Sequence, residues 1–291
     1  MYMGGGNILV SNISSNFRMW DTTGNIGPVL ANLPDDLRGL VKQNTTTSVS
    51  AGSPIVFCPG DSVILTVSGA IGGYQWYMDG AAITGATDAS FTAYGTGLYN
   101  AVYTDSFGVT DSVLYGINVI VLPTPTVANP GNTIACHGTA TADIHFSGTV
   151  SGTVYNWTND NPSVGIAASG SGDILSFTAL NPGTAPDTAH ITVTPTASGC
   201  TGAPVTFLIV VKPMPVLSSA IADTVCDSTA FIYAPLSATA GTTFAWTRAA
   251  VTGISNTAGG GPDGISDTLN NIITDPVTVA YIYTLNANGC I

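Results

Sequence analysis

The amino-acid sequence predicts an all-β fold, built from tandem β-sandwiches in an elongated array. Three observations lead to this prediction. Apolar residues alternate with polar ones along short segments, turn-forming residues separate those segments, and one pattern of Cys, Trp and Gly occurs twice at a fixed offset. Alternation with a period of two is typical of strands that bury one face. A fixed period of this kind indicates a duplicated domain.

The expected strands are rich in Thr, Val, Ile and Tyr, which suit a half-buried pleated surface. The alternation is clearest in the segments Asp61–Val67, Gly97–Tyr103 and Thr188–Thr194. Gly and Pro lie between such runs, for example in Asn181-Pro182-Gly183, and mark turns. Short strands with a turn about every 8–12 residues favour sandwiches. Leu33–Val41 is expected to form at most one helical turn.

Composition excludes several classes of function. Charged residues make up only 8% of the chain, the net charge is −12, and no Lys or Arg occurs between Gln43 and Val211. Binding of nucleic acid requires clustered cations and is therefore not expected, and an anionic membrane surface is disfavoured for the same reason. No apolar run reaches the roughly 18 residues that a membrane-spanning helix needs. Residues 1–30 do not have the pattern of a signal peptide. Either a signal peptide was removed or, as we expect, the chain begins inside a longer protein.

The five cysteines carry the strongest signal in the sequence. They are Cys58, Cys136, Cys200, Cys226 and Cys290. The interval from Cys136 to Cys200 equals that from Cys226 to Cys290, 64 residues in both cases (200−136 and 290−226), and the two pairs are offset by 90 (226−136). Trp157 lies 21 residues after Cys136, and Trp246 lies 20 after Cys226.

Three interpretations of these cysteines compete. Zinc ligation requires closely spaced ligands, and a catalytic thiol requires a paired His; neither suits two equivalent, widely spaced pairs. Disulfides within each repeat, Cys136–Cys200 and Cys226–Cys290, fit best. Each would stabilise its domain by about 4 kcal/mol in the chain-entropy model. Disulfides persist outside the cytosol, so an extracellular location at a cell surface is expected.

Two Pro-rich joints set the expected domain boundaries. They are Leu122-Pro123-Thr124-Pro125 and Lys212-Pro213-Met214-Pro215, and Pro cannot continue a central strand. The expected domains are residues 1–47, 48–122, 126–212 and 216–291, with stiff, extended linkers between them.

Residues 48–122 resemble a bacterial immunoglobulin-like domain. The resemblance is carried by Tyr74-Gln75-Trp76-Tyr77-Met78-Asp79-Gly80 and by Gly97-Leu98-Tyr99. It implies that Trp76 is the core Trp of the third strand and that Tyr99 forms a tyrosine corner. Leu65 and Ala101 stand where antibody-type domains have bridging cysteines.

Cys58 lies before the strand that contains Leu65. Relatives often pair a Cys at this place with a Cys in the last hairpin, where this chain has Val109. Cys58 is therefore expected to be a free thiol. Two interpretations remain open for it: a point of interchain attachment, or a small residue left buried after its partner was lost.

Residues 126–212 and 216–291 resemble the PKD-like domains of very large surface proteins of gliding bacteria. In the first copy the resemblance is carried by Cys136, 155–159, 165–170, 174–179 and Ile191–Cys200; in the second it is carried by Cys226, Phe244–Arg248 and Asn288-Gly289-Cys290. Trp157 and Trp246 are the expected core residues.

The second copy is expected to lack its last strand and to expose a sheet edge. The first copy continues after Cys200 with the apolar run Val205–Val211, whereas only Ile291 follows Cys290.

The N-terminal part resembles one repeat of an NHL-type β-propeller. The resemblance rests on Gly6–Asn12, Asn16–Met19 and Asp21–Asn25. One blade cannot fold as a propeller, so it would be the remnant of a larger domain. The alternative is a loose two-stranded hairpin.

No metal, cofactor or catalytic site is expected. His137, His145 and His190 fall on different strands of one domain, which favours solvated side chains. The acidic residues are scattered and contain no Asp-x-Asp-x-Asp loop of the kind that binds calcium. Motifs of hydrolases and of phosphate-binding loops are absent from the sequence, so the chain is not expected to be an enzyme.

The sequence therefore favours non-catalytic structural or adhesive stalk domains of a secreted surface protein. The resemblance implies export by type IX secretion and a role in adhesion or gliding. The expected partners are a glycan or protein ligand and adjacent domains of a longer chain. The alternative is a set of spacer or carbohydrate-binding domains in a larger secreted enzyme, for which Tyr74, Trp76 and Tyr77 would be the aromatic candidates.

Overall fold

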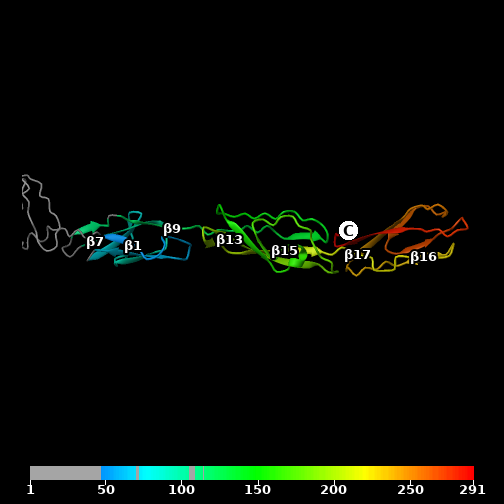
Figure 1. The fold of residues 1–291 in the computed structure, drawn as a ribbon, viewed down its shortest axis with the longest axis horizontal. Coiled ribbons are helices and arrows are strands. Elements are labelled where there is room, and N and C mark those ends of the chain that lie inside the picture. Colours follow the sequence, from blue (N-terminus) through cyan, green and yellow to red (C-terminus); the bar gives the residue numbers. More distant parts are fainter. Residues whose placement is uncertain (1–46, 70–71, 105–108, 114) are drawn as a thin grey trace, which may run out of the picture. The chain divides into compact units, whose positions relative to one another are not determined.

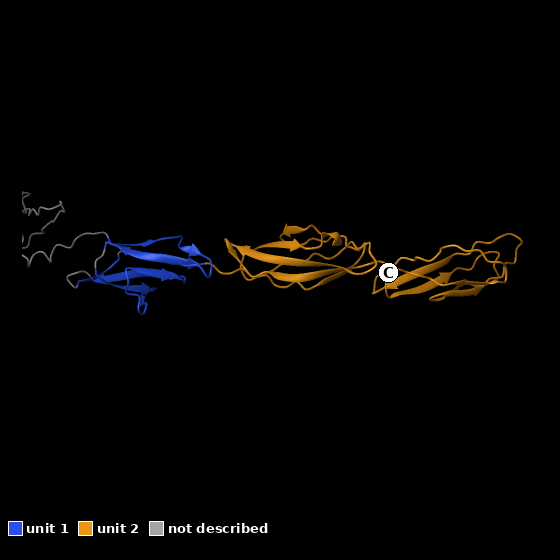
Figure 2. Cartoon of the chain, turned by 90° about the horizontal axis from the view of Figure 1, so that it is seen from below, with its two compact units in different colours: residues 1–121 blue, residues 122–291 orange. Residues whose placement is uncertain are grey.

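The computed structural model describes residues 47–291, apart from 70–71, 105–108 and 114. The described residues form strands and one short 3-10 turn, η1 (Pro162–Val164), and they confirm the predicted all-β class (Figure 1). The expected propeller-like segment and the helical turn at Leu33–Val41 lie outside the described residues. The chain divides into two compact units, residues 1–121 and 122–291 (Figure 2).

The first unit contains two sheets that face each other across a hydrophobic core. One sheet has the order β1 (Ser48–Ala51), β3 (Val63–Ser68), β6 (Ser90–Ala93). The other has the order β2 (Val56–Phe57), β9 (Ile117–Val121), β7 (Gly97–Thr104), β4 (Gly73–Met78), β5 (Ala81–Ala82), with β8 (Thr110–Ser112) paired to β7. The predicted alternation at 61–67 and 97–103 is confirmed by β3 and β7.

Trp76 and Tyr99 lie in this core, and each donates a side-chain hydrogen bond to a backbone carbonyl. Trp76 is fully buried, and its Nε1 donates to the Asp88 carbonyl at 2.9 Å. The Tyr99 hydroxyl donates to the Gly95 carbonyl at 3.1 Å, four residues upstream, as in a tyrosine corner. Leu65 contributes to the core where a bridging cysteine would otherwise stand.

The second unit begins with a sandwich that we call the second sandwich (residues 126–212). Its main sheet has the order β10 (Thr133–Cys136), β15 (Val205–Lys212), β13 (Asp187–Ala197), β11 (Val154–Asn159), β12 (Ser169–Ser171), with β14 (Cys200–Thr201) paired to β13. Two isolated bridges, Ala140–Thr178 and Ile144–Ile174, belong to the facing layer. The last strand, β15, fills the core with side chains that are at most 1% exposed: Phe207, Ile209 and Val211.

The remainder of this unit forms the third sandwich (residues 216–291). One sheet pairs β16 (Ala230–Tyr233) with β19 (Ile265–Thr268); the other has the order β18 (Gly259–Pro262), β17 (Thr242–Arg248), β20 (Tyr281–Ala287). All of residues 216–291 are described, and within them β20 pairs with β17 alone. The truncation of this copy before its last strand stays a prediction.

In both repeats the Trp lies opposite a glycine of the neighbouring strand. Trp157 pairs across the strands with Gly170, and Trp246 pairs with Gly261. An added Cβ at Gly170 would lie 2.2 Å from the Trp157 ring, so the indole occupies the space that a side chain would need. Trp157 is buried, but Trp246 is only half-buried. The prediction of Trp246 as a core residue is thus corrected, because the third sandwich buries far less than the second.

Candidate functional site

A disulfide joins the second sandwich to the third. Cys136, at the end of β10, is bonded to Cys290, which follows β20, with a Cα–Cα distance of 5.6 Å and a sequence separation of 154. Near this bond the Lys212 ammonium donates to the Asn288 carbonyl at 2.8 Å. The end of one sandwich is therefore linked covalently to a hairpin of the next.

The predicted pairings Cys136–Cys200 and Cys226–Cys290 are wrong. β10 runs parallel to β15, so Cys136 lies beside Lys212 at one end of the sheet, next to the start of β13. Cys200 follows the far end of β13, about 33 Å away at the usual rise of a strand. A disulfide needs Cα atoms within about 7 Å, so the two cysteines of one repeat cannot meet.

The predicted states of the other cysteines are also corrected. Cys58, expected to be free, is disulfide-bonded, as is Cys200. Cys226, expected to be bonded, is a free, exposed thiol. Cys226 occupies the position of Cys136 in the repeat, but it lies in a segment, residues 221–230, in which every residue is exposed.

The two repeats share a detailed polar contact that identifies equivalent positions. Asn181 accepts from the Gly183 amide at 3.0 Å and donates to the Ala185 carbonyl at 2.9 Å. Asn271, 90 residues later (271−181), accepts from the Ile273 amide at 3.0 Å and donates to the Asp275 carbonyl at 3.0 Å. The offset of the cysteines therefore also holds for side-chain hydrogen bonds.

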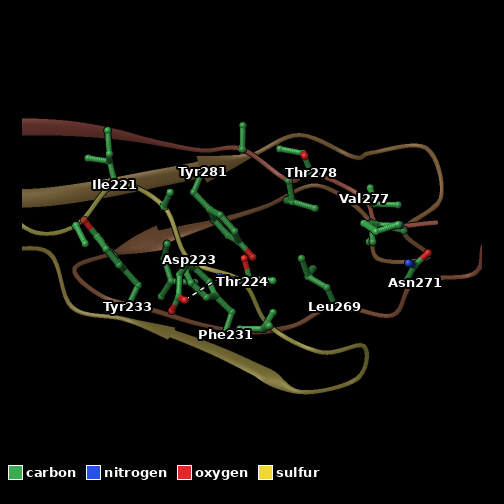
Figure 3. Close-up of a pocket in the computed structure, with 18 of the residues that line it drawn as sticks. Ile221, Asp223, Thr224, Phe231, Tyr233, Leu269, Asn271, Val277, Thr278 and Tyr281 are labelled. Carbon is green, nitrogen blue, oxygen red and sulfur yellow. Dashed lines mark hydrogen bonds between the residues drawn. The ribbon is translucent and has the colours of Figure 1, made fainter. Parts of the chain in front are cut away.

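Asn181 makes one further contact, which Asn271 lacks. Its Nδ2 also donates to the Val211 carbonyl of β15 at 2.7 Å. Within residues 216–291 no strand lies at the place of β15, and a cavity of about 790 Å³ is found there. Asn271 lies on the wall of this cavity (Figure 3).

The cavity is open between two segments and has an apolar floor. One wall is the exposed segment that contains Ile221 and Val225, and the other runs from Val277 to Tyr281. Phe231 lies on the floor and packs against Tyr281 with ring centroids 5.3 Å apart (Figure 3). Ile221 is 89% exposed and Val225 41% exposed, so the cavity leaves apolar surface in contact with solvent.

A buried ion pair lies beside this cavity. The Arg248 side chain, only 4% exposed, donates from Nε to Asp267 at 2.9 Å and from Nη2 to the Thr257 carbonyl at 2.7 Å. The Tyr281 hydroxyl donates to the same carboxylate oxygen at 2.9 Å. Burial, reinforced by the hydrogen bond to Asp267, raises the pKa of Tyr281 to about 12.

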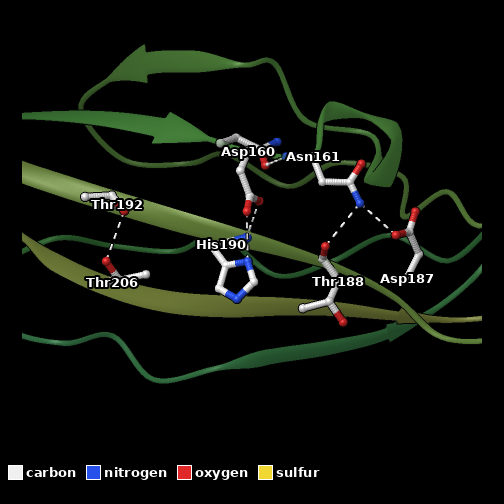
Figure 4. A network of polar contacts seen from close by, with 8 residues as sticks. Asp160, Asn161, Asp187, Thr188, His190, Thr192 and Thr206 are labelled. Carbon is white, nitrogen blue, oxygen red and sulfur yellow. Dashed lines mark hydrogen bonds and ion pairs between the residues drawn. The ribbon is translucent and has the colours of Figure 1, made fainter.

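The histidines form separate surface contacts. His190 donates from its backbone amide to Asp160 at 2.7 Å and contacts the same carboxylate through Nδ1 at 2.9 Å (Figure 4). These hydrogen bonds lower the pKa of Asp160. His145 contacts Asp173 at 2.7 Å, which raises the pKa of His145 and lowers that of Asp173. The Nδ1 of His137 accepts from the backbone N–H of Asn181 at 2.8 Å. The three histidines do not converge.

The same face of the second sandwich carries further polar pairs. Asn161 donates to Asp187 at 2.7 Å and to the Thr188 carbonyl at 3.1 Å, and Thr192 contacts Thr206 at 3.0 Å (Figure 4). Polar side chains that are hydrogen-bonded to one another, including the carboxylates of Asp160 and Asp187, thus cover this surface.

Several other expectations concern sites of binding. Among the described residues, no cluster of three or more His, Cys, Asp or Glu side chains could hold a metal ion. Within the same part of the chain, no helix is long and apolar enough to cross a membrane. Of the aromatic candidates for a glycan platform, Tyr74 and Tyr77 are half-buried and Trp76 is fully buried, so the three do not form an exposed row.

Comparison with known proteins identifies part of the chain. Residues 132–215, which contain the strands of the second sandwich, match the PKD-like domain family. The resemblance of this segment to PKD-like domains is thereby confirmed. None of the curated proteins matches the chain.

Solved structures of immunoglobulin domains give weaker likenesses. The insect immune protein hemolin has 10% identity and a TM-score of 0.34, with 68% of this chain and 55% of hemolin covered. Extracellular domains 3–5 of Drosophila OTK have 13% identity and a TM-score of 0.29, with 70% of this chain and 78% of the OTK structure covered. This chain thus spans about half of hemolin, and at these scores the likenesses carry no argument about function.

Sequence reasoning missed the contacts that define the cavity. The early end of the second copy predicted an exposed sheet edge. Asn181 and Asn271 were not predicted to belong to a site, because a lone Asn near a turn is common. Their matching offset of 90 residues was the available signal. Nothing in the pattern marked Arg248 and Asp267 as partners.

Proposed function

We propose that this chain is a set of non-catalytic structural or adhesive domains from a secreted protein at a cell surface. The observation that carries the proposal is the Cys136–Cys290 disulfide between successive sandwiches. A bond at this place fixes how neighbouring domains are joined, which is useful where domains must transmit force or hold a binding region away from a surface.

The chemistry of the cysteines supports an extracellular location. Disulfides between domains persist where thiols are not kept reduced, and four of the five cysteines are disulfide-bonded. The resemblance to surface proteins of gliding bacteria supports adhesion or gliding after type IX secretion. The proposed partners are a protein or glycan on the opposing surface and adjacent domains of a longer chain. Burial of Trp76 speaks against carbohydrate binding through that aromatic group.

The proposal is tested on intact cells of the source organism. An antibody raised against residues 216–291 should label intact cells or the culture medium, and gentle protease treatment should remove the label from the cells. A cell attachment assay with the antibody as a blocker then tests the adhesive role. Labelling that requires permeabilised cells would contradict the proposal.

A further inference from the structure

We propose that Cys226 is the attachment point of a further disulfide, formed with the hairpin cysteine of a sandwich that follows the third one in a longer chain. The partner is a cysteine of the type of Cys200 and Cys290, each of which directly follows a Gly in a tight hairpin turn. The inference rests on the proposed function, because that function includes adjacent domains of a longer chain, and it names the bond that holds the next of them.

The Cys136–Cys290 disulfide shows which two places such a bond joins. Cys136 lies beside Lys212, the last residue of β15, after which the chain leaves the second sandwich through Pro213. Cys290 closes a hairpin of the third sandwich, where it exchanges two backbone hydrogen bonds with Ala287, of 2.9 and 3.0 Å. The bond therefore runs from the exit end of one sandwich to a hairpin of the next.

Cys226 is presented by the same turn as Cys136. The carbonyl of each cysteine accepts from the backbone N–H three residues later, at 3.1 Å for Cys136 and at 3.2 Å for Cys226. The third residue of each turn has a positive φ, 79° at Gly138 and 56° at Ser228. A positive φ is uncommon for a residue with a side chain. The turn is thus kept at Cys226 although Ser stands in the place of Gly.

A neighbouring segment holds both turns in the same way. The Gly138 N–H donates to the Ala179 carbonyl at 2.8 Å, and the Ser228 N–H donates to the Leu269 carbonyl at 3.0 Å. Donors and acceptors are both offset by 90 residues (228−138 and 269−179). Cys226 therefore has the place of Cys136 in the folded repeat as well as in the sequence.

Cys58 is a third cysteine on a turn of this kind. It follows β2, which runs parallel to the last strand of its sandwich, β9, as β10 runs parallel to β15. Its carbonyl accepts from the Asp61 N–H at 3.1 Å, and Gly60 has a φ of 99°. Cys58 and Cys136 are disulfide-bonded, whereas the thiol of Cys226 is free and exposed. All five cysteines lie in the described residues, so Cys226 is the one turn cysteine of residues 1–291 that still has a bond to make.

The partner of Cys226 does not lie within residues 1–291. The other four cysteines are bonded, including both hairpin cysteines, Cys200 and Cys290. The offset of the duplication places the expected partner about 90 residues after Cys290. The Cys136–Cys290 bond joins two different places of the repeat, which disfavours a bond between the Cys226 residues of two copies.

Formation of the bond is a two-electron oxidation. Each thiol gives up its proton, and the two sulfur atoms together give up two electrons to a disulfide oxidant, which becomes two thiols. Such an oxidant acts outside the cytosol, where thiols are not kept reduced. The exposure of Cys226 leaves its sulfur accessible to exchange with the oxidant.

The first test uses the full secreted protein from the source organism. Free thiols are blocked with N-ethylmaleimide at harvest, and the protein is digested without reduction and analysed by mass spectrometry. We expect the Cys226 peptide to be linked, in most copies, to a later peptide of the same chain that has Gly before its Cys. A Cys226 that carries the blocking group would overturn the inference, as would two Cys226 peptides linked to each other.

An extended chain tests the same bond with a defined partner. Residues 202–291 are appended after Ile291, which continues the duplication in register, and the chain is oxidised in a glutathione mixture. We expect a bond between Cys226 and the added copy of Cys290, which leaves one free thiol, on the added copy of Cys226. The matched control carries Cys290→Ser in the added copy alone and should have two free thiols.

Two results of this second test would overturn the inference. One is an equal number of free thiols in the extended chain and its control while the Cys136–Cys290 bond is intact, because the intact bond shows that the fold is kept. The other is loss of the Cys136–Cys290 bond itself, since the inference is drawn from that bond.

Failure of the inference is distinguishable from failure of the proposed function. Intact cells that are labelled by the antibody while Cys226 carries the blocking group would keep the surface location and overturn the further disulfide. Protein confined to the cell interior would contradict the proposed function, and the extended chain would then decide whether Cys226 accepts the hairpin cysteine of a following sandwich.

Discussion

Removal of the Cys136–Cys290 bond should destabilise the third sandwich selectively. When this sandwich unfolds and the second stays folded, Cys136 remains beside Lys212 in the sheet. The bond then closes a loop of roughly 80 residues, from Lys212 to Cys290, in the unfolded part. In the chain-entropy model this restriction is worth about 4.5 kcal/mol.

The double variant Cys136→Ser/Cys290→Ser removes the bond without leaving a stray thiol. Native-state hydrogen exchange, read by mass spectrometry, reports the opening equilibrium of each sandwich separately. A loss of about 4.5 kcal/mol corresponds to exchange on the order of a thousandfold faster for the most protected amides of β17 and β20. Amides of β13 and β15 should change little.

The control is Cys226→Ser, which removes an exposed free thiol. It should change stability by no more than about 0.5 kcal/mol. Less than tenfold faster exchange in β17 and β20 of the double variant would refute the reasoning. Equal acceleration in β13 would also refute it, because the two sandwiches would then unfold as one unit.

Three further predictions concern single side chains. Gly170→Ala places a Cβ 2.2 Å from the Trp157 ring and should cost about 1–3 kcal/mol in urea unfolding. Arg248→Met removes the cation beside the Asp267 carboxylate, which keeps the hydrogen bond from Tyr281, and should cost about 3 kcal/mol in the same assay, followed in the third sandwich. Tyr281 has a pKa raised above the value of about 10 in the unfolded chain to about 12, so its contribution to stability is complete below pH 10 and is lost as the pH rises to 12. Tyr281→Phe should flatten this alkaline decline, and absorbance titration should show one phenol fewer ionising near pH 12.

Each of these predictions has a contradicting result. Gly170→Ala with unchanged stability would mean that the Trp157 ring is free to move aside. Arg248→Met with unchanged stability would mean that Asp267 is solvated. An alkaline decline that is the same with and without Tyr281 would mean that other groups cause it.

Much of the fold follows from local pattern. The alternation at 188–194 and the apolar run at 205–211 correspond to β13 and β15, because a strand with one buried face must alternate. The resemblance to PKD-like domains holds for residues 132–215. The division into four domains stays a prediction, since the compact units separate residues 1–121 from 122–291 and place no boundary after Lys212.

The pairing of the cysteines could not be predicted from spacing alone. Equal intervals show that Cys136 and Cys226 are equivalent, but they do not say at which end of a sandwich each lies. That depends on β10 joining β15 in parallel, a long-range pairing that moves Cys136 to the far end from Cys200. The cavity of the third sandwich was not predicted for a similar reason, because the equivalence of Asn271 to Asn181 becomes clear only from their shared side-chain hydrogen bonds.

The central claim is that a disulfide joins successive sandwiches, and one measurement tests it most directly. The chain, purified without reductant and with free thiols blocked, is digested by protease and analysed by mass spectrometry. The account predicts a linked peptide pair containing Cys136 and Cys290, with a blocked thiol on Cys226. Linked pairs of Cys136 with Cys200 and of Cys226 with Cys290 would contradict it and would place each bond inside a single repeat.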